Sequence, residues 1–202
     1  MTNFPLPIAS CSCTVRAVKR LALLTLLGAC AGTIDGPGSG DDQTPPDDSS
    51  AVGRAMQWVE AMVPYCQAPN HKPDPDAACP STCNRPDVPE WDPYRSDCSG
   101  LVSWAWNLPA PGRITDTFAP YDGTVSHAIT ASDLASGDAV NNDHHIMLFK
   151  EWVTPGSEAT FIDEPGCSSS EPYAREFTAD VTLDGQTITV QYHGTFTAIR
   201  ED

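Results

Sequence analysis

The segment from Pro64 to Ser96 constrains the fold of this chain most strongly, because it holds eight prolines and three cysteines. Proline fixes φ and removes a backbone donor, so neither a regular helix nor a central strand runs through such a segment. No hydrophobic periodicity is sustained there. We therefore predict a long loop that depends on covalent cross-links to hold its shape.

Residues 1–30 have the pattern of an export signal. Three basic residues precede the apolar run 21–27, which is too short for a permanent membrane span but suits a signal peptide. The run ends in Leu-Gly-Ala-Cys30, which resembles the bacterial lipobox. That resemblance implies cleavage before Cys30 and lipidation of its thiol, so we expect an exported, lipid-anchored protein of the bacterial cell envelope. An ordinary secretory signal or a short anchor is the alternative.

The next twenty residues, 31–50, consist mainly of Gly, Pro, Asp and Ser and read as a flexible acidic linker before a domain at 51–202. The chain has 11 basic and 27 acidic residues, a net charge of −16. Residues 1–30 hold three basic and no acidic residues. After their removal, 8 basic and 27 acidic residues remain, which gives a net charge of −19. This balance excludes a nucleic-acid partner, and it leaves lipid on Cys30 as the membrane tether. We expect a monomer.

The eight cysteines divide by position. Cys11 and Cys13 leave with the signal, Cys30 is the lipid site, and Cys98 stands in a motif of its own. An even number of remaining cysteines in an exported chain predicts two disulfides with three possible connectivities. A zinc site is the alternative, but the chain has no paired CxxC, and we expect neither a metal nor another cofactor. The disulfide candidates are Cys66, Cys79, Cys83 and Cys167.

Hydrophobic periodicity predicts helices first and strands afterwards. Apolar residues recur every three or four positions over 52–63, and an apolar run from Cys98 to about Asn107 follows the N-cap candidate Asp97. Helices followed by an antiparallel sheet indicate an α+β fold. The predicted strands are 139–140, 145–150, 159–163, 177–183, 186–192 and 195–199, with a hairpin turn at Asp184-Gly185.

Cys98 and His145 have the positions of a thiol nucleophile and its base. A cysteine attacks as thiolate, and the free N–H groups and positive dipole of a helix N-terminus favour that form. The N–H of Cys98 is also a natural oxyanion donor, because first-turn amides have no intrahelical acceptor. A histidine at a strand start supplies the ion-pair partner and proton donor.

Two motifs resemble those of the NlpC-type cell-wall peptidases, which are papain-like enzymes. DCSGLVSWAW, containing Cys98, resembles the nucleophile motif, and SGDAVNNDHHIMLF resembles the histidine motif 47 residues later. The resemblance implies a papain-like fold, with N-terminal helices and a central nucleophile-bearing helix packed on an antiparallel sheet. It also implies cleavage of peptidoglycan stem peptides. The apolar residues after His145 fit the family strand, so His145 is the expected base and His144 its neighbour.

The remaining site residues are carried over from the resemblance. The residue that orients the histidine is Asp163 if the strand follows the NlpC pattern and Glu164 if it follows that of the related CHAP amidases, and we favour Glu164. Tyr65 matches a family tyrosine near the oxyanion hole, although Cys66-Gln67 replaces the usual glycines. Ser99 and Gly100 are expected on the substrate side, where Gly100 leaves room for a substrate backbone.

These observations predict a cysteine hydrolase that cuts amide bonds in peptidoglycan stem peptides. A CHAP-like amidase cutting the sugar–peptide bond is a second enzyme reading. A catalytically inactive wall-binding lipoprotein is the alternative from another functional class.

Overall fold

The computed structural model describes residues 49–202, which all belong to one compact unit. The predicted signal peptide, the lipidation site Cys30 and nearly all of the predicted linker 31–50 lie outside the described residues. Within residues 49–202, the structure has no helix with the length and apolar character needed to cross a bilayer.

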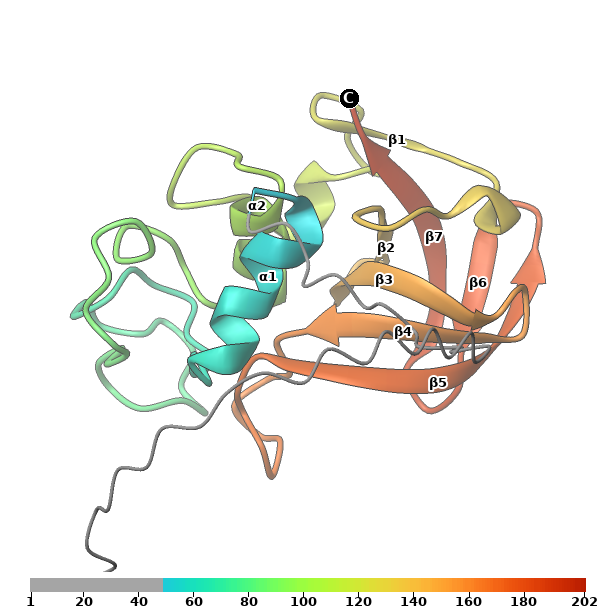
Figure 1. The fold of residues 1–202 in the computed structure, drawn as a ribbon. Coiled ribbons are helices and arrows are strands. Elements are labelled where there is room, and N and C mark those ends of the chain that lie inside the picture. Colours follow the sequence, from blue (N-terminus) through green and yellow to red (C-terminus); the bar gives the residue numbers. More distant parts are fainter. Residues whose placement is uncertain (1–48) are drawn as a thin grey trace, which may run out of the picture. The chain divides into compact units, whose positions relative to one another are not determined.

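Two short helices precede the strands. α1 (Ala51–Glu60) is capped by the Ser50 side chain, which accepts a hydrogen bond from the N–H of Gly53. α2 (Cys98–Ala105) is capped in the same way by Asp97, and seven of its eight residues are buried. The two helices pack together and against the outer face of the sheet (Figure 1).

The strands form one antiparallel sheet in the order β1-β7-β2-β3-β4-β5-β6. β6 also pairs with β7, so six strands close into an antiparallel barrel (Figure 1). β1 lies outside this ring and pairs with the last residues of β7. The strands are β1 (Ser126–Ala128), β2 (Ala139–Asn141), β3 (Ile146–Thr154), β4 (Glu158–Asp163), β5 (Arg175–Asp184), β6 (Thr187–Val190) and β7 (Gly194–Glu201).

The barrel corrects the predicted fold class. The prediction of an α+β, papain-like NlpC-type fold with N-terminal helices on an antiparallel sheet is wrong, because the described residues are mostly β and have only two short α-helices. The positions of the helices and most strands follow the hydrophobic pattern, but the pairing of β6 with β7 does not. Closure buries the inner face of every strand, whereas an open sheet leaves edges and one wet face.

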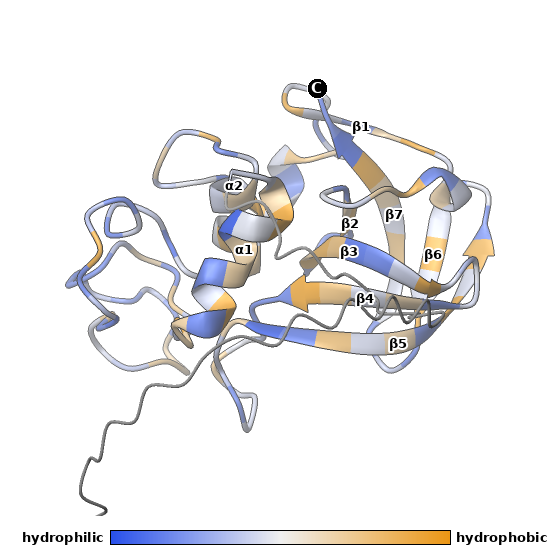
Figure 2. Ribbon diagram, viewed as in Figure 1, coloured by the Kyte–Doolittle hydropathy of each residue, from blue (hydrophilic) through white to orange (hydrophobic). Residues whose placement is uncertain are grey.

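Side chains on alternate strand positions enter two different cores. Met147 and Phe149 of β3 point into the barrel, together with apolar residues from all five other barrel strands. Ile146 and Leu148 of the same strand point outward and pack under the helices. Figure 2 shows the alternation of apolar and more polar residues along β6, where Ile188 and Val190 are the inward residues. Each strand therefore has an inner and an outer row.

Four segments meet at one end of the barrel, which we call the barrel mouth. They are the turn 142–145 before β3, Asp163 at the end of β4, Arg175 at the start of β5 and the turn 191–193 between β6 and β7. The strand registers place them together, because Asn141 pairs with Ile146, Asp163 with Arg175, and Val190 with Gly194.

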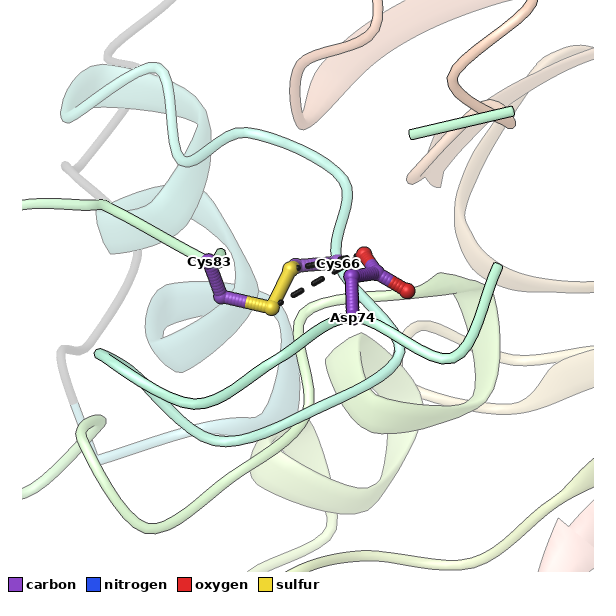
Figure 3. Close-up of side chains that lie close together, drawn as sticks. All are labelled: Cys66, Asp74 and Cys83. Carbon is purple, nitrogen blue, oxygen red and sulfur yellow. Dashed lines mark hydrogen bonds between the residues drawn. A yellow bond between two sulfur atoms is a disulfide. The ribbon is translucent and has the colours of Figure 1, made fainter. Parts of the chain in front are cut away.

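The proline-rich loop is held by two disulfides, Cys66–Cys83 and Cys79–Cys167. This is one of the three connectivities that the spacing allows. The first disulfide lies beside a carboxylate, with Oδ2 of Asp74 2.8 Å from Sγ of Cys66 and 3.7 Å from Sγ of Cys83 (Figure 3). Within residues 49–202, Cys98 is the free cysteine.

Candidate active site

Cys98 is the first residue of α2. The Asp97 side chain accepts a 2.8 Å hydrogen bond from the N–H of Gly100, which closes the first turn around Cys98. Arg95 forms an ion pair with the buried Asp97 carboxylate. No acceptor in the described part of the chain takes the N–H of Cys98, so this group is free to bind an oxyanion.

His145 lies against Cys98 at the barrel mouth. Burial lowers the pKa of His145, but hydrogen bonds to Asp163 and to the Cys98 thiol, and the negative charges of both groups, raise it to about 10. An imidazole that holds its proton beside a thiol favours the thiolate–imidazolium pair. His144 points elsewhere, since its side chain is 86% exposed and faces Asp143.

Asp163 holds the imidazole. Its Oδ2 lies 3.2 Å from Nε2 of His145, which leaves Nδ1 as the ring nitrogen available to Cys98. Arg175 donates to the same carboxylate, from Nε to Oδ1 at 2.8 Å. Burial raises the pKa of Asp163, but the hydrogen bonds and charges of His145 and Arg175 outweigh it and lower the pKa. Asp163 is therefore an ionised carboxylate although it is 1% exposed.

Glu164, which the sequence argument favoured for this role, does not contact the histidine. It is fully buried, and neither of its carboxyl oxygens has a hydrogen-bond partner within residues 49–202. Burial and the charges of Asp163, Asp97 and Cys98 raise its pKa well above the ordinary value. The orienting position belongs to Asp163, and burial of Glu164 favours its neutral form.

Tyr65 lies near the nucleophile on a segment held from both sides. The N–H of Tyr65 donates to the carbonyl of Pro172 at 2.9 Å, and the next residue, Cys66, exchanges two backbone hydrogen bonds with Ser96. Burial raises the pKa of Tyr65 to about 12, with further increases from the charges of Asp97 and Cys98. Its hydroxyl accepts a 3.0 Å hydrogen bond from Gln67, so its own proton remains available as a donor.

The structure uses Ser99 and Gly100 inside the protein, where the sequence argument placed them on the substrate side. The Ser99 hydroxyl donates to Asp97, and the residue is 2% exposed. A Cβ on Gly100 would lie 2.0 Å from the carbonyl oxygen of Arg95, so only glycine fits. Its small size permits packing against the preceding loop, and no substrate contact is needed to explain it.

Within residues 49–202, two clusters contain metal-ligand residue types, but both are centred on disulfides. One is Cys66, Asp74 and Cys83, and the other places Asp76 beside the Cys79–Cys167 disulfide. Each sulfur is bonded to another sulfur, which leaves a single carboxylate per cluster as a charged ligand. That set is too small for a structural metal site.

Two residues of the mouth, Arg175 and His193, were not predicted from the sequence. Arg175 lies two residues before the predicted strand 177–183, and the alternation that ends at Phe177 extends back to it. His193 belongs to a turn whose neighbours are known only once the barrel is closed. No signal in the sequence connects it with His145.

Comparisons with protein-family models, with curated proteins and with solved structures found no match for this chain. The site therefore has to be interpreted from its own chemistry. Its parts are a free thiol at a helix start with an unpaired N–H, an imidazole in contact with the thiol, a buried carboxylate behind the imidazole, and a tyrosine nearby. These are the groups that acyl transfer through a thioester requires.

Proposed function

We propose that this protein is an exported, lipid-anchored cysteine hydrolase that cuts amide bonds in peptidoglycan stem peptides. The observation that carries the proposal is the contact of the free Cys98 thiol with His145, which Asp163 orients. The two motifs that resemble those of the NlpC-type peptidases support the substrate class. Export and anchoring rest on the signal and lipobox motifs in residues 1–30.

In this proposal the Cys98 thiolate attacks the carbonyl carbon of the substrate amide. The oxygen becomes an oxyanion, which the N–H of Cys98 and the hydroxyl of Tyr65 stabilise. The C–N bond breaks as His145 gives its proton to the leaving amine, and a thioester to Cys98 remains. Water then attacks the thioester while His145 takes its proton, which releases a carboxylic acid and restores the ion pair.

The test compares wild-type protein with Cys98→Ala on purified peptidoglycan. We expect wild type to release soluble fragments with new amino and carboxyl ends, and the variant to release none above background. Alkylation provides a second measurement, because reaction of the free Cys98 thiol with iodoacetamide should abolish the release of fragments. Equal release by both proteins would refute the proposal.

An amidase that cuts the sugar–peptide bond is the second candidate. It is supported by the residue type at the orienting position, since the CHAP amidases use an acidic residue or Asn there and NlpC-type peptidases usually have His, Asn or Gln; the position itself, Asp163, is the one that the NlpC-type pattern predicted. Mass spectrometry of the released fragments separates the two candidates. Free intact stem peptides indicate an amidase, and shortened stems that remain attached to sugar indicate a peptidase.

A further inference from the structure

The turn 191–193 faces the catalytic residues across the barrel mouth. It connects β6 to β7 at the end of the barrel where Asp163 and Arg175 pair. Phe196, three residues after His193, reaches the imidazole of His145 with a ring-centroid distance of 6.4 Å. In the six-strand ring β6 lies opposite β3, on which α2 packs, so the turn lies on the side of the mouth away from α2.

His193 is fixed in this turn by stacking. Its ring lies 4.4 Å from the ring of Phe177, with an angle of 17° between the planes. The guanidinium of Arg175 lies 5.3 Å from the centre of the same phenyl ring, and Arg175 donates to Asp163. A continuous set of contacts thus connects His193 to the carboxylate that orients His145.

The backbone N–H of His193 donates to Val190, but neither ring nitrogen has a hydrogen-bond partner within the described residues. The ring nitrogens are not among the buried unpartnered polar atoms, so they are accessible from outside although one ring face is covered by Phe177. Stacking alone does not require nitrogen, and a phenyl ring would pack on Phe177 without having polar atoms to satisfy. Burial lowers the pKa of His193, so the ring is neutral and offers one N–H donor and one acceptor.

The neighbouring residue adds to this argument. Tyr192 has a left-handed backbone conformation with φ of 66°, and its side chain is 95% exposed. A non-glycine residue in this conformation is strained, and strained turns are concentrated at functional sites. This backbone conformation at Tyr192 belongs to the turn in which the next side chain, His193, packs on Phe177.

We propose that His193 is a substrate-binding residue, whose ring nitrogens hydrogen-bond to a peptide amide group of the substrate as it lies across the barrel mouth. A neutral imidazole matches an amide, which likewise has one donor and one acceptor. The proposal rests on the proposed hydrolase function and identifies the part of the protein that holds the peptide on the side opposite α2.

The test uses His193→Phe, which keeps an aromatic ring on Phe177 and removes both nitrogens. With soluble stem peptides still attached to sugar as substrate, KM should rise about tenfold while kcat stays within about twofold, as expected for one lost hydrogen bond. His193→Asn, which retains a donor and an acceptor, should recover part of the loss. The matched control is His127→Phe, because His127 is an exposed histidine on β1, near the opposite end of β7.

A KM of His193→Phe within twofold of the wild-type value would refute the inference and leave the hydrolase proposal intact. A fall in kcat and in melting temperature without a rise in KM would also refute it, because a purely structural role predicts that result. If wild type shows no hydrolysis that depends on Cys98, the hydrolase proposal fails and the assignment of His193 fails with it. Titration of Cys98→Ala with the same peptides provides a readout free of turnover, and the His193→Phe change should weaken that binding about tenfold as well.

Discussion

Replacing Asp163 by Asn tests the electrostatic argument for the site most directly. The substitution keeps the shape of the side chain and removes its charge. At the observed 3.2 Å from Nε2 of His145, and with an effective dielectric constant of about 20, that charge stabilises the imidazolium by at most ~5 kcal/mol. Arg175 neutralises part of the same carboxylate, so we expect the pKa of His145 to fall from about 10 by roughly 1 to 3 pH units.

The sign of the effect follows from which form is active. In the proposed mechanism the imidazolium is the active form, so activity is retained below the pKa of His145 and is lost as the pH rises through it. In Asp163→Asn the alkaline limb of kcat/KM should therefore move to lower pH, with a loss of about 3-fold to 200-fold at pH 9.5 for a pKa lower by roughly 1 to 3 units, and a much smaller loss at pH 6.5.

The assay is kcat/KM against pH between 5.5 and 10.5, with unfolding curves to show that the variant remains folded. Asp180→Asn is the matched control, since Asp180 is an exposed aspartate on the same sheet. An alkaline limb within about 0.3 pH units of wild type would mean that Asp163 does not hold the imidazolium. The role given to it above would then be refuted.

Three further predictions concern other parts of the site. Glu164→Gln should retain activity and raise the free energy of unfolding by about 1 kcal/mol at pH 8 but not at pH 4, because a carboxyl whose pKa is raised by burial destabilises the fold increasingly as the pH rises above about 4.3. Denaturant unfolding at both pH values measures this, and loss of activity in the variant would contradict it. Tyr65→Phe should lower kcat by about 10- to 100-fold with little change in KM, because it removes an oxyanion donor; unchanged kcat in steady-state assays would remove Tyr65 from the mechanism. Asp74→Asn should speed reduction of the adjacent Cys66–Cys83 disulfide by glutathione about fivefold, because a carboxylate repels an attacking thiolate by ~1 kcal/mol at roughly 4 Å in water. A reduction rate equal to that of wild type in a thiol-trapping time course would show that the Asp74 charge does not affect the attack.

The sequence was sufficient for the parts of the molecule that depend on short-range pattern. The start of α2 at Cys98 followed from a capping residue before an apolar run, and the strands from alternation. The closure of the barrel did not follow, because it depends on one pairing, β6 with β7, between strands that look alike whether a sheet is open or closed. The fold class was wrong for that reason.

The residue that orients His145 could not be predicted from the sequence either. Asp163 and Glu164 are adjacent carboxylates, and sequence alone gives no means of choosing between them. The alternation along β4 distinguishes them, because Asp163 follows Ala159 and Phe161 on the face that points into the barrel, whereas Glu164 comes one residue later. Likewise, the connectivity of the disulfides depends on where a loop without regular structure folds back, which spacing does not encode.

The alternation of inner and outer rows has a consequence for how this protein tolerates change. His145, just before β3, and Asp163, at the end of β4, continue the inward-facing rows of Met147 and Phe161, while Ile162 faces the helices. Deleting one residue within β4 would exchange the faces of every residue beyond the deletion, and Glu164 would then occupy the place of the aspartate. Length variation in these two strands is therefore as damaging as substitution of a catalytic residue, whereas the loops at the far end of the barrel are free to vary in length. In a set of homologous sequences, the spacing from His145 to Asp163 along the two strands should be a more stringent signature of the enzyme than the identity of any core residue.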